Sequence, residues 1–228
     1  RMRSAASERF LAEMGSRRAH ESAAVSAARA AYLVGFDATS NLEAGMRYGI
    51  PTMGTSAHSF TLLYETEDAA FEAQLSALGN GTTLLVDTFD VRRAVHKAVE
   101  LTGGAIGAVR LDSGDLVQSA IEVRAQLDAL GSTSTKITVT SDLDEYTIAA
   151  LAQAPVDSYG VGTSVVTGSG HPTAGFVYKL VSHFDKEQWV DVAKKSANKT
   201  SRGGAKKARR LLEDSVATTE LIGNPTSG

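Results

Sequence analysis

Segments that favour helix alternate with short apolar segments along most of this 228-residue chain. The helix-like segments are rich in good helix formers and contain no Pro. They cover residues 21–33, 41–48, 68–78, 91–101, 115–130 and 143–151. Strand-like apolar runs lie at 50–54, 82–89, 108–111, 136–140 and 156–163. Repeated β–α units predict a parallel sheet covered by helices, either an open doubly wound sheet or a (β/α) barrel.

The composition excludes several classes of protein. Hydrophobic residues make up 43% of the chain and charged residues 21%, as in a soluble globular protein. With no Cys and no HExxH pattern among 5 His, neither a disulfide framework nor a zinc site is expected. Because no run of about 18 apolar residues occurs, we expect no membrane association and a cytoplasmic location. The nucleotide-binding fingerprints GxGxxG, after the first strand, and GxxxxGK followed by Ser or Thr are also absent.

The charge of the chain is unevenly distributed. Between Lys194 and Arg210 there are eight basic residues and no acidic ones. The rest of the chain therefore holds 15 of the 23 basic residues and all 26 acidic residues. An acidic body of this kind argues against a nucleic-acid-binding protein. The basic stretch itself is compatible either with binding RNA or phosphate or with a solvated loop.

The pattern changes after Gly175. FVYKLVSHF and WVDVAKKS alternate apolar and polar residues around the turn DKEQ, which predicts an antiparallel hairpin. The tail after Arg210 reads as a helix-like piece followed by a polar end. At the other end, the chain opens on Arg1 inside a helix-like segment, from which we expect a fragment of a longer protein.

Polar residues follow most of the predicted strands. In a (β/α) barrel, reactive side chains lie just past the carboxyl ends of the strands, so these residues would form one polar ring. The ring favours the barrel over the doubly wound sheet, and we interpret it as an active site. Its segments are 15–18, 36–41, 54–59, 87–88, 110–115, 140–144 and 160–164.

Several ring residues suggest a phosphorylated ligand. Gly162 and Thr163 offer backbone N–H groups and a hydroxyl for a phosphate, although GxGT also makes tight turns. Ser141 and Asp142 open a helix, where a plain N-cap is the alternative.

The segment RLDSGDL is more specific. Arg110 and Asp112 are two residues apart at the end of an apolar strand, so their side chains share one strand face. A guanidinium can hold a carboxylate or phosphate through two hydrogen bonds, and the Asp can accept from ribose hydroxyls. A buried salt bridge is the alternative interpretation.

His58 is the candidate nucleophile. It follows the small polar residues GTSA and begins a helix, and neutral imidazole attacks phosphorus readily. We assign no role to the other four histidines, His20, His96, His171 and His183.

These segments together resemble the nicotinate phosphoribosyltransferase family, particularly its actinobacterial members. The matching stretches are EMGSRRAH, GFDATSNLEAGMRYGIPTMGTSAHSF, LLVDTFD, AVRLDSGDL, VTSDLDEY, DSYGVGTSVVTGS, VYKLV and VAKKS. The resemblance implies an irregular (β/α) barrel of the type II phosphoribosyltransferase kind with part of a flanking α/β domain. We expect the barrel, incomplete at its N-terminus, over 1–175, and the hairpin, basic loop and tail over 176–228.

The resemblance also implies the reaction. It would condense nicotinate with phosphoribosyl pyrophosphate, giving nicotinate mononucleotide and pyrophosphate, in an ATP-coupled step of NAD salvage. His58 matches the family's phosphorylated histidine. Arg110 and Asp112 match residues that hold the pyridine carboxylate and the ribose. Arg17 matches an arginine at the base and phosphate site. The residues that match the 5′-phosphate cradle are Ser141, Asp142, Gly162 and Thr163.

Ser40 bears on the choice of base. Nicotinamide-using relatives carry an Asp near this position, whereas a neutral Ser beside Arg110 suits a carboxylate, which an Asp would repel. We therefore expect nicotinate rather than nicotinamide. The resemblance further implies ATP as co-substrate, Mg²⁺ without assigned ligands, and a homodimer in the full-length form.

Three other functions stay open. A barrel fragment could bind phosphorylated ligands without turnover, which the resemblance to only part of the family's chain favours. A nicotinamide- or quinolinate-using phosphoribosyltransferase is a closer competitor, although quinolinate would require more cationic residues for its two carboxylates. An aldolase would need a Schiff-base Lys at a strand end, and the strand ends named above carry none.

Overall fold

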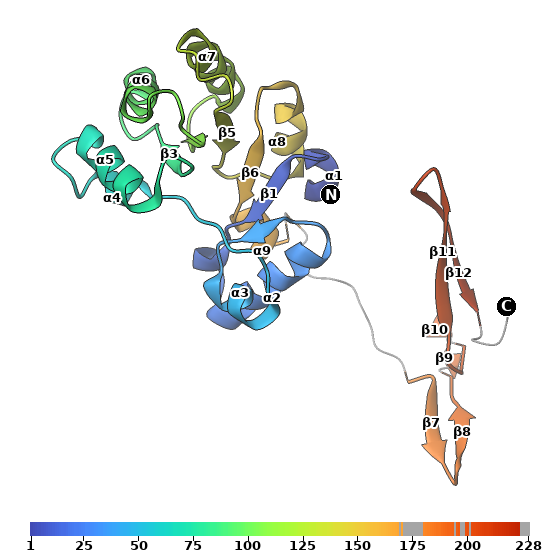
Figure 1. Cartoon of the computed structure of the whole chain (residues 1–228). Helices are drawn as coiled ribbons and strands as arrows, with labels where there is room; N and C mark the ends of the chain where they lie inside the picture. The colour runs from blue at the N-terminus through green and yellow to red at the C-terminus, as the bar shows by residue number, and fades with distance from the viewer. Residues whose placement is uncertain (169, 171–179, 194, 197–198, 201, 224–228) are drawn as a thin grey trace. The chain divides into compact units, whose positions relative to one another are not determined.

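The computed structural model describes residues 1–168, 170, 180–193, 195–196, 199–200 and 202–223 (Figure 1). Its contacts divide the chain into two compact units, Arg1–Thr173 (unit 1) and Ala174–Gly228 (unit 2). Unit 1 holds the parallel sheet and its helices. Unit 2 holds only antiparallel strand pairs among its described residues.

Unit 1 contains a six-stranded parallel sheet. Its strands are β1 (Phe10–Glu13), β2 (Ala38–Thr39), β3 (Thr83–Leu85), β4 (Ala108–Leu111), β5 (Lys136–Val139) and β6 (Ser158–Val161). The order across the sheet is β2-β1-β6-β5-β4-β3, so the last strand pairs with the first. This cyclic order is that of a (β/α) barrel, and it excludes the doubly wound alternative, which changes direction within the sheet. The predicted barrel architecture is thus confirmed as a partial α/β barrel.

The barrel has a seam between β2 and β3. The strand predicted at 50–54 is absent there, since this segment forms only one isolated bridge, between Thr52 and Thr39. Pro51 has no N–H to donate to a strand ladder, and Gly54 disfavours extended pairing, which explains why the prediction was wrong. The segment instead runs as a loop to His58, along the edge of the sheet.

The helices of unit 1 follow its strands, and α5, α6 and α7 neighbour one another outside the sheet (Figure 1). The α-helices are α1 (Met2–Ala6), α2 (Glu21–Leu33), α3 (Leu42–Tyr48), α4 (His58–Thr61), α5 (Glu67–Leu78), α6 (Val91–Thr102), α7 (Leu116–Ala129), α8 (Glu145–Ala150) and α9 (Thr163–Val166). Two 3₁₀ turns cover Ser16–Arg18 and Leu151–Gln153. In the part of the chain that the structure describes, no helix is both long enough and apolar enough to cross a bilayer.

The core of unit 1 explains its apolar strands. Leu84, Val109 and Ile137 are paired across β3, β4 and β5 and are fully buried. Leu111 and Val139, at the next position but one of their strands, are also buried. Arg110 and Thr138, which alternate with these residues along β4 and β5, are buried on the opposite face, so neither face of these two strands meets water.

Unit 2 consists of short antiparallel pairs. They are β7 (Ser182–Asp185) with β8 (Gln188–Asp191), β9 (Lys195–Ser196) with β10 (Lys199–Thr200), and β11 (Lys207–Glu213) with β12 (Val216–Gly223). The first pair turns at Lys186–Glu187, which confirms the predicted hairpin over 182–191. The beginning of its first predicted strand, at 176–179, lies outside the described residues.

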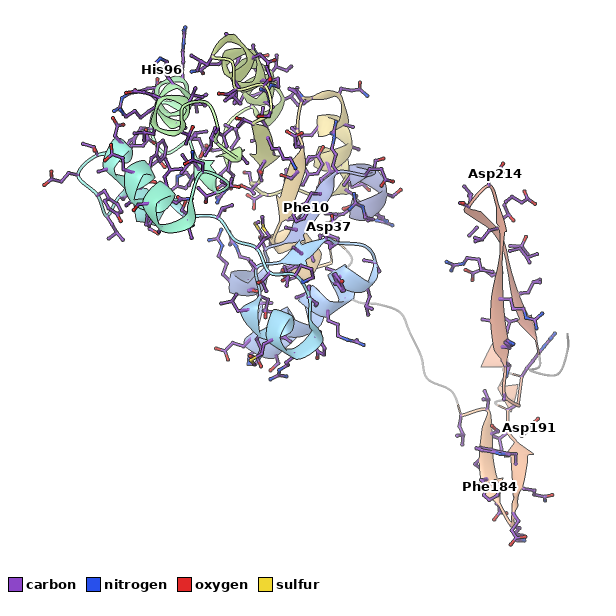
Figure 2. All side chains as sticks on the ribbon, in the orientation of Figure 1. Phe10, Asp37, His96, Phe184, Asp191 and Asp214 are labelled. Atoms are coloured by element: carbon purple, nitrogen blue, oxygen red, sulfur yellow. The ribbon has the colours of Figure 1, made fainter. Side chains whose placement is uncertain are left out.

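The prediction of a helix-like piece after Arg210 was wrong. Residues 207–223 form a hairpin that turns at Asp214 and Ser215, both with positive φ, and Asp214 lies at its tip (Figure 2). Positive φ at both turn residues is typical of the tight turns that join antiparallel strands. The β-branched residues Val216, Thr218 and Thr219 favour a strand after that turn. The part of the basic stretch from Lys207 onward is therefore strand rather than loop.

Candidate functional site

A cavity of about 550 Å³ lies at the carboxyl ends of the strands of unit 1. It brings together all nine side chains and glycines that the sequence singled out: Arg17, Ser40, His58, Arg110, Asp112, Ser141, Asp142, Gly162 and Thr163. Its remaining lining residues include Met14, Arg18, Thr55 and Thr140. Parallel strands end at one edge of the sheet, and this edge therefore collects residues that are up to 146 positions apart, from Arg17 to Thr163.

Asp37 is an exception among the ring residues expected at strand ends. It precedes β2, and its Oδ2 accepts a hydrogen bond from the Leu11 N–H at 2.8 Å and pairs with Arg3 at 3.0 Å. Figure 2 shows it beside Phe10, at the beginning of β1. Asp37 thus anchors the opposite end of the strand from the cavity. The interpretation of this residue as part of the ring was wrong.

His58 begins α4 at the cavity wall. Its Nδ1 lies 3.1 Å from Thr88 Oγ1. Its Nε2 lies 3.5 Å from Asp112 Oδ2 and 3.9 Å from Asp87 Oδ1. One ring nitrogen thus faces two carboxylates while the other faces a hydroxyl.

Asp87 was named in the sequence only as part of the polar ring segment 87–88 and was given no role of its own. Its Oδ2 accepts from the Asp112 N–H at 2.8 Å and from Ser113 Oγ at 2.7 Å. Its Oδ1 is buried, has no hydrogen-bond partner, and faces His58. A buried acceptor without a donor is costly, which makes Asp87 a functional candidate. Its place directly after β3 is the signal that could have identified it.

Arg110 is buried and held on several sides. Its Nε donates to Thr140 Oγ1 at 3.0 Å, and Nη1 donates to Thr55 Oγ1 and to the Ser56 carbonyl, the latter at 2.9 Å. Its Nη2 forms an ion pair with Asp112 Oδ1 at 3.2 Å, so the salt bridge considered as the alternative interpretation forms inside the cavity. The hydrogen bonds occupy three of the five guanidinium N–H donors. A substrate carboxylate can therefore take hydrogen bonds from Nη2 without the release of a present hydrogen-bond partner.

Ser141 and Asp142 do not cap the helix that follows them. Asp144 caps α8, and its Oδ1 accepts from the N–H groups of Tyr146 and Thr147 at 3.0 and 2.8 Å. The hydrogen bond from the Thr147 N–H holds the pKa of Asp144 below its usual value of 3.8. Ser141 has a φ of 91°, a conformation that is strained for a residue other than Gly and that turns the chain at the cavity edge.

Two glycines at the end of β6, Gly160 within the strand and Gly162 just after it, have a packing reason. A Cβ on Gly160 would lie 2.6 Å from Met14 Sδ and 2.8 Å from Thr140 Cγ2. A Cβ on Gly162 would lie 3.1 Å from the Met14 carbonyl oxygen. Close approach to Met14 thus explains Gly160, while Gly162 and Thr163 line the cavity in addition.

Three of the other histidines lie away from the cavity. His96 is on the exposed face of α6 (Figure 2), His20 caps α2 by accepting from the Ser22 N–H at 3.3 Å, and His183 is on β7. His171 lies outside the described residues. No group of three or more His, Asp or Glu side chains suited to a metal ion occurs among the residues that the structure describes.

Comparison with known proteins agrees with the geometry. The model of the nicotinate phosphoribosyltransferase (NAPRTase) family matches residues 10–221. The chain belongs to this family. It is 56% identical, over 97% of its length, to nicotinate phosphoribosyltransferase pncB1 of Mycobacterium tuberculosis, and 42% identical, over 89%, to nicotinate phosphoribosyltransferase of Bacillus subtilis.

A solved structure of the NAPRTase family supports the fold. The crystal structure of human nicotinic acid phosphoribosyltransferase matches 100% of this chain and 54% of its own, with a TM-score of 0.72 and 26% identity. The two bacterial relatives are matched over 51% and 44% of their lengths. The chain therefore spans about half the length of the curated relatives it matches.

Proposed function

We propose that the cavity condenses nicotinate with phosphoribosyl pyrophosphate, giving nicotinate mononucleotide and pyrophosphate in an ATP-coupled reaction of NAD salvage. The observation that carries this proposal is His58 at the cavity wall, with carboxylates 3.5 and 3.9 Å from Nε2 and the Arg110–Asp112 pair beside it. Membership of the NAPRTase family supports the same reaction.

The surroundings of His58 suit a phosphoryl acceptor. Asp87 and Asp112 favour a proton on Nε2, because each attracts an N–H there. Nδ1, beside Thr88, then keeps its lone pair. Attack of that lone pair on the γ-phosphorus of ATP forms an N–P bond and breaks the P–O bond to ADP. Hydrolysis of the N–P bond after turnover releases phosphate and restores the imidazole.

The remaining lining residues suit the two substrates of the condensation. Arg110 offers positive charge and the N–H groups of Nη2 to the pyridine carboxylate, and the neutral Ser40 does not repel it. Asp112 is placed to accept from ribose hydroxyls. The pyridine nitrogen attacks the anomeric carbon of the ribose, and the C–O bond to pyrophosphate breaks.

The cationic and polar rim suits the phosphates. Arg17 is proposed at the base and phosphate site, and the 5′-phosphate is proposed to lie against four residues from two neighbouring strand ends. These are Ser141, Asp142, Gly162 and Thr163.

Mg²⁺ is part of the proposal. The unpartnered Asp87 Oδ1 and the adjacent Asp112 carboxylate are oxygen donors that suit this ion. Two carboxylates without a third ligand group fit an ion that keeps its waters and binds pyrophosphate oxygens. When bound, Mg²⁺ would neutralise part of the negative charge of pyrophosphate.

The decisive experiment labels the chain with ATP carrying a radioactive γ-phosphate. We expect an acid-labile phosphate on the wild-type chain and at least a hundredfold less label on His58→Ala, because the nucleophile is gone. His96→Ala, on the exposed face of α6, is the matched control and should label normally. Equal labelling of His58→Ala and wild type would refute the phosphohistidine. In a complete enzyme of this family, the same change should abolish the coupling to ATP but leave slow, uncoupled synthesis of nicotinate mononucleotide.

The choice of base is tested by product formation with nicotinate and with nicotinamide. We expect nicotinate to be preferred, because Arg110 is cationic and Ser40 carries no charge. A preference for nicotinamide would contradict this part of the proposal.

A second function is binding of phosphorylated ligands without turnover, which the half-length match to the relatives favours. Titration calorimetry with phosphoribosyl pyrophosphate, combined with an assay for base-dependent pyrophosphate release, separates the two. Binding without release would favour the second function. The homodimer and the cytoplasmic location also belong to the proposal, and sedimentation of the chain tests the first of them.

A further inference from the structure

Glu13, at the end of β1, is a buried carboxylate that the proposed chemistry does not use. It is fully buried and does not line the cavity. Its Oε1 accepts from the Gly15 N–H at 2.5 Å, and its Oε2 accepts from Thr39 Oγ1 at 2.5 Å. One donor lies in the loop after β1 and the other at the end of β2, so one side chain ties the loop after β1 to the end of β2.

These contacts continue into a closed ring. Thr39 Oγ1 also accepts from the Asn41 N–H at 3.0 Å, and Asn41 Nδ2 donates to Ser16 Oγ at 3.0 Å. Ser16 adjoins Gly15, which returns the path to Glu13. We call Glu13, Gly15, Ser16, Thr39 and Asn41 the Glu13 ring.

The ring flanks two cavity residues. Ser40 lies between Thr39 and Asn41, and its N–H donates to the Glu13 carbonyl at 2.8 Å. Arg17 follows Ser16 directly. Both Ser40 and Arg17 line the cavity. The Glu13 ring therefore fixes the backbone on both sides of Ser40 and immediately before Arg17.

The loop after β1 has little room to adapt if the ring is broken. A Cβ on Gly15 would lie 2.3 Å from Val166 Cγ1 and 2.8 Å from the Gly162 carbonyl oxygen. A shift of Gly15 therefore disturbs the loop after β6 as well. Burying a carboxylate is costly unless its hydrogen bonds are made, and bonds to a charged acceptor are stronger than neutral ones. An apolar side chain would fill the space but could not set the spacing of the two segments.

We propose that Glu13 is a positioning residue for recognition of the pyridine base, which acts by fixing Ser40 and Arg17 through the Glu13 ring. This inference rests on the proposed function, because it assigns the two residues to base binding. Glu13 itself does not touch the base.

The test compares three variants of the 228-residue chain. In Glu13→Gln, an amide N–H₂ replaces one acceptor and the negative charge is lost, so Thr39 Oγ1 keeps its contact only by accepting instead of donating, and the charge-assisted hydrogen bonds weaken. Thr39→Val removes the hydroxyl that joins Glu13 to Asn41, whereas Thr39→Ser keeps it. Titration calorimetry measures the affinities for nicotinate, nicotinamide and phosphoribosyl pyrophosphate. Amide hydrogen exchange follows residues 14–18 and 39–42.

We expect Glu13→Gln and Thr39→Val to weaken nicotinate binding about tenfold, which corresponds to about 1.4 kcal/mol. The preference for nicotinate over nicotinamide should fall in both, and residues 14–18 and 39–42 should exchange faster. Thr39→Ser should stay within about twofold of wild type in each affinity, as a rescue by the conservative variant. If Glu13→Gln does not fold, the Thr39→Val and Thr39→Ser pair carries the test.

Two results would overturn the inference. One is unchanged nicotinate affinity and base preference in Thr39→Val. The other is an equal loss for all three ligands with the base preference unchanged, which indicates a purely structural role. If the wild-type chain bound no nicotinate, the proposed function would fail first. Hydrogen exchange would then still show whether the Glu13 ring holds the two segments.

Discussion

The two units of this chain use strand pairing in opposite ways. In unit 1, parallel strands are buried on both faces, and Leu84, Val109 and Leu111 lie in one continuous core. In unit 2, every residue of β11 and β12 is exposed, including Leu212 and Ile222. The described site residues all belong to unit 1. A site that needs several side chains in fixed positions is built where packing, rather than a local turn, determines the backbone.

The hairpin of unit 2 depends on local contacts. Arg210 and Glu220 face each other across β11 and β12 and form an ion pair in which both side chains are more than 60% exposed. Exposed pairs of this kind contribute little, and an isolated two-stranded hairpin is marginally stable in water. Truncating a side chain should therefore have very different consequences in the two units.

The largest contrast is expected between two leucine-to-alanine changes. Leu111→Ala, in buried strand β4, should lower the free energy of unfolding of unit 1 by about 3 kcal/mol, because it leaves a cavity in the core. Leu212→Ala, on exposed β11, should change the free energy of unfolding by less than about 0.5 kcal/mol. Urea unfolding followed by circular dichroism measures both. Comparable losses would mean that β11 is as well packed as β4.

A contrast of intermediate size is expected from Glu67, at the start of α5. Its side chain is buried, neither carboxylate oxygen has a hydrogen-bond partner, and Arg93 Nη1 lies 3.7 Å away. Burial raises the pKa of Glu67 above its usual 4.5, against the lowering effect of Arg93 and with smaller raising effects from Asp68 and Asp90. Between 4.5 and the raised value, folded Glu67 keeps a proton that the unfolded chain has lost. Stability from this group therefore falls as pH rises through that window.

Glu67→Gln should remove this dependence. The variant should gain stability relative to wild type on going from pH 4 to pH 7, as measured by urea unfolding at the two pH values. Glu220→Gln, in the exposed pair of unit 2, is the matched control and should change the free energy of unfolding by less than about 0.5 kcal/mol. If Glu67→Gln instead lost stability toward pH 7, the ion pair with Arg93 would outweigh the burial of the carboxylate.

The smallest effect is expected at the turn of the β11–β12 hairpin. Ser215 has a φ of 65°, which Gly adopts without the cost that a side chain brings. Ser215→Gly should stabilise the hairpin by a few tenths of a kcal/mol up to about 1 kcal/mol. Nuclear magnetic resonance shifts of β11 and β12 would report a larger hairpin population. Unchanged shifts would indicate that contacts other than the turn set the stability of this hairpin.

Where pattern and local chemistry coincide, the sequence alone predicts the structure well. The helix Glu21–Leu33 and the strand Ala108–Leu111 form within the predicted bounds, because Ala-rich and buried apolar segments have one favourable state. The tail after Arg210 failed as a prediction, since LLE is compatible with helix until the turn at Asp214 is known. The segment 50–54 failed because its sequence does not reveal that it pairs with β2 only through one isolated bridge, between Thr52 and Thr39.

In the candidate site, too, some residues could be predicted from the sequence and others could not. Its nine predicted residues could be named from strand ends and from the resemblance to the NAPRTase family, and the structure places them around one cavity. Glu13 could not be assigned in this way, and Asp87 and Thr88 were named only as members of the polar ring, without a role. The orphaned oxygen of Asp87 and the burial of Glu13 arise only when separate loops meet.

The sequence by itself determined the alternation of helix and strand, the polar strand ends and the family. Those depend on local propensity and on motifs that are continuous along the chain. Only the tertiary structure decided that β6 pairs with β1, that the seam lies between β2 and β3, and that His58 faces two carboxylates. These features join residues 29 to 148 positions apart, as between Asp87 and His58 or Phe10 and Ser158, and such distances are set by packing rather than by any local pattern.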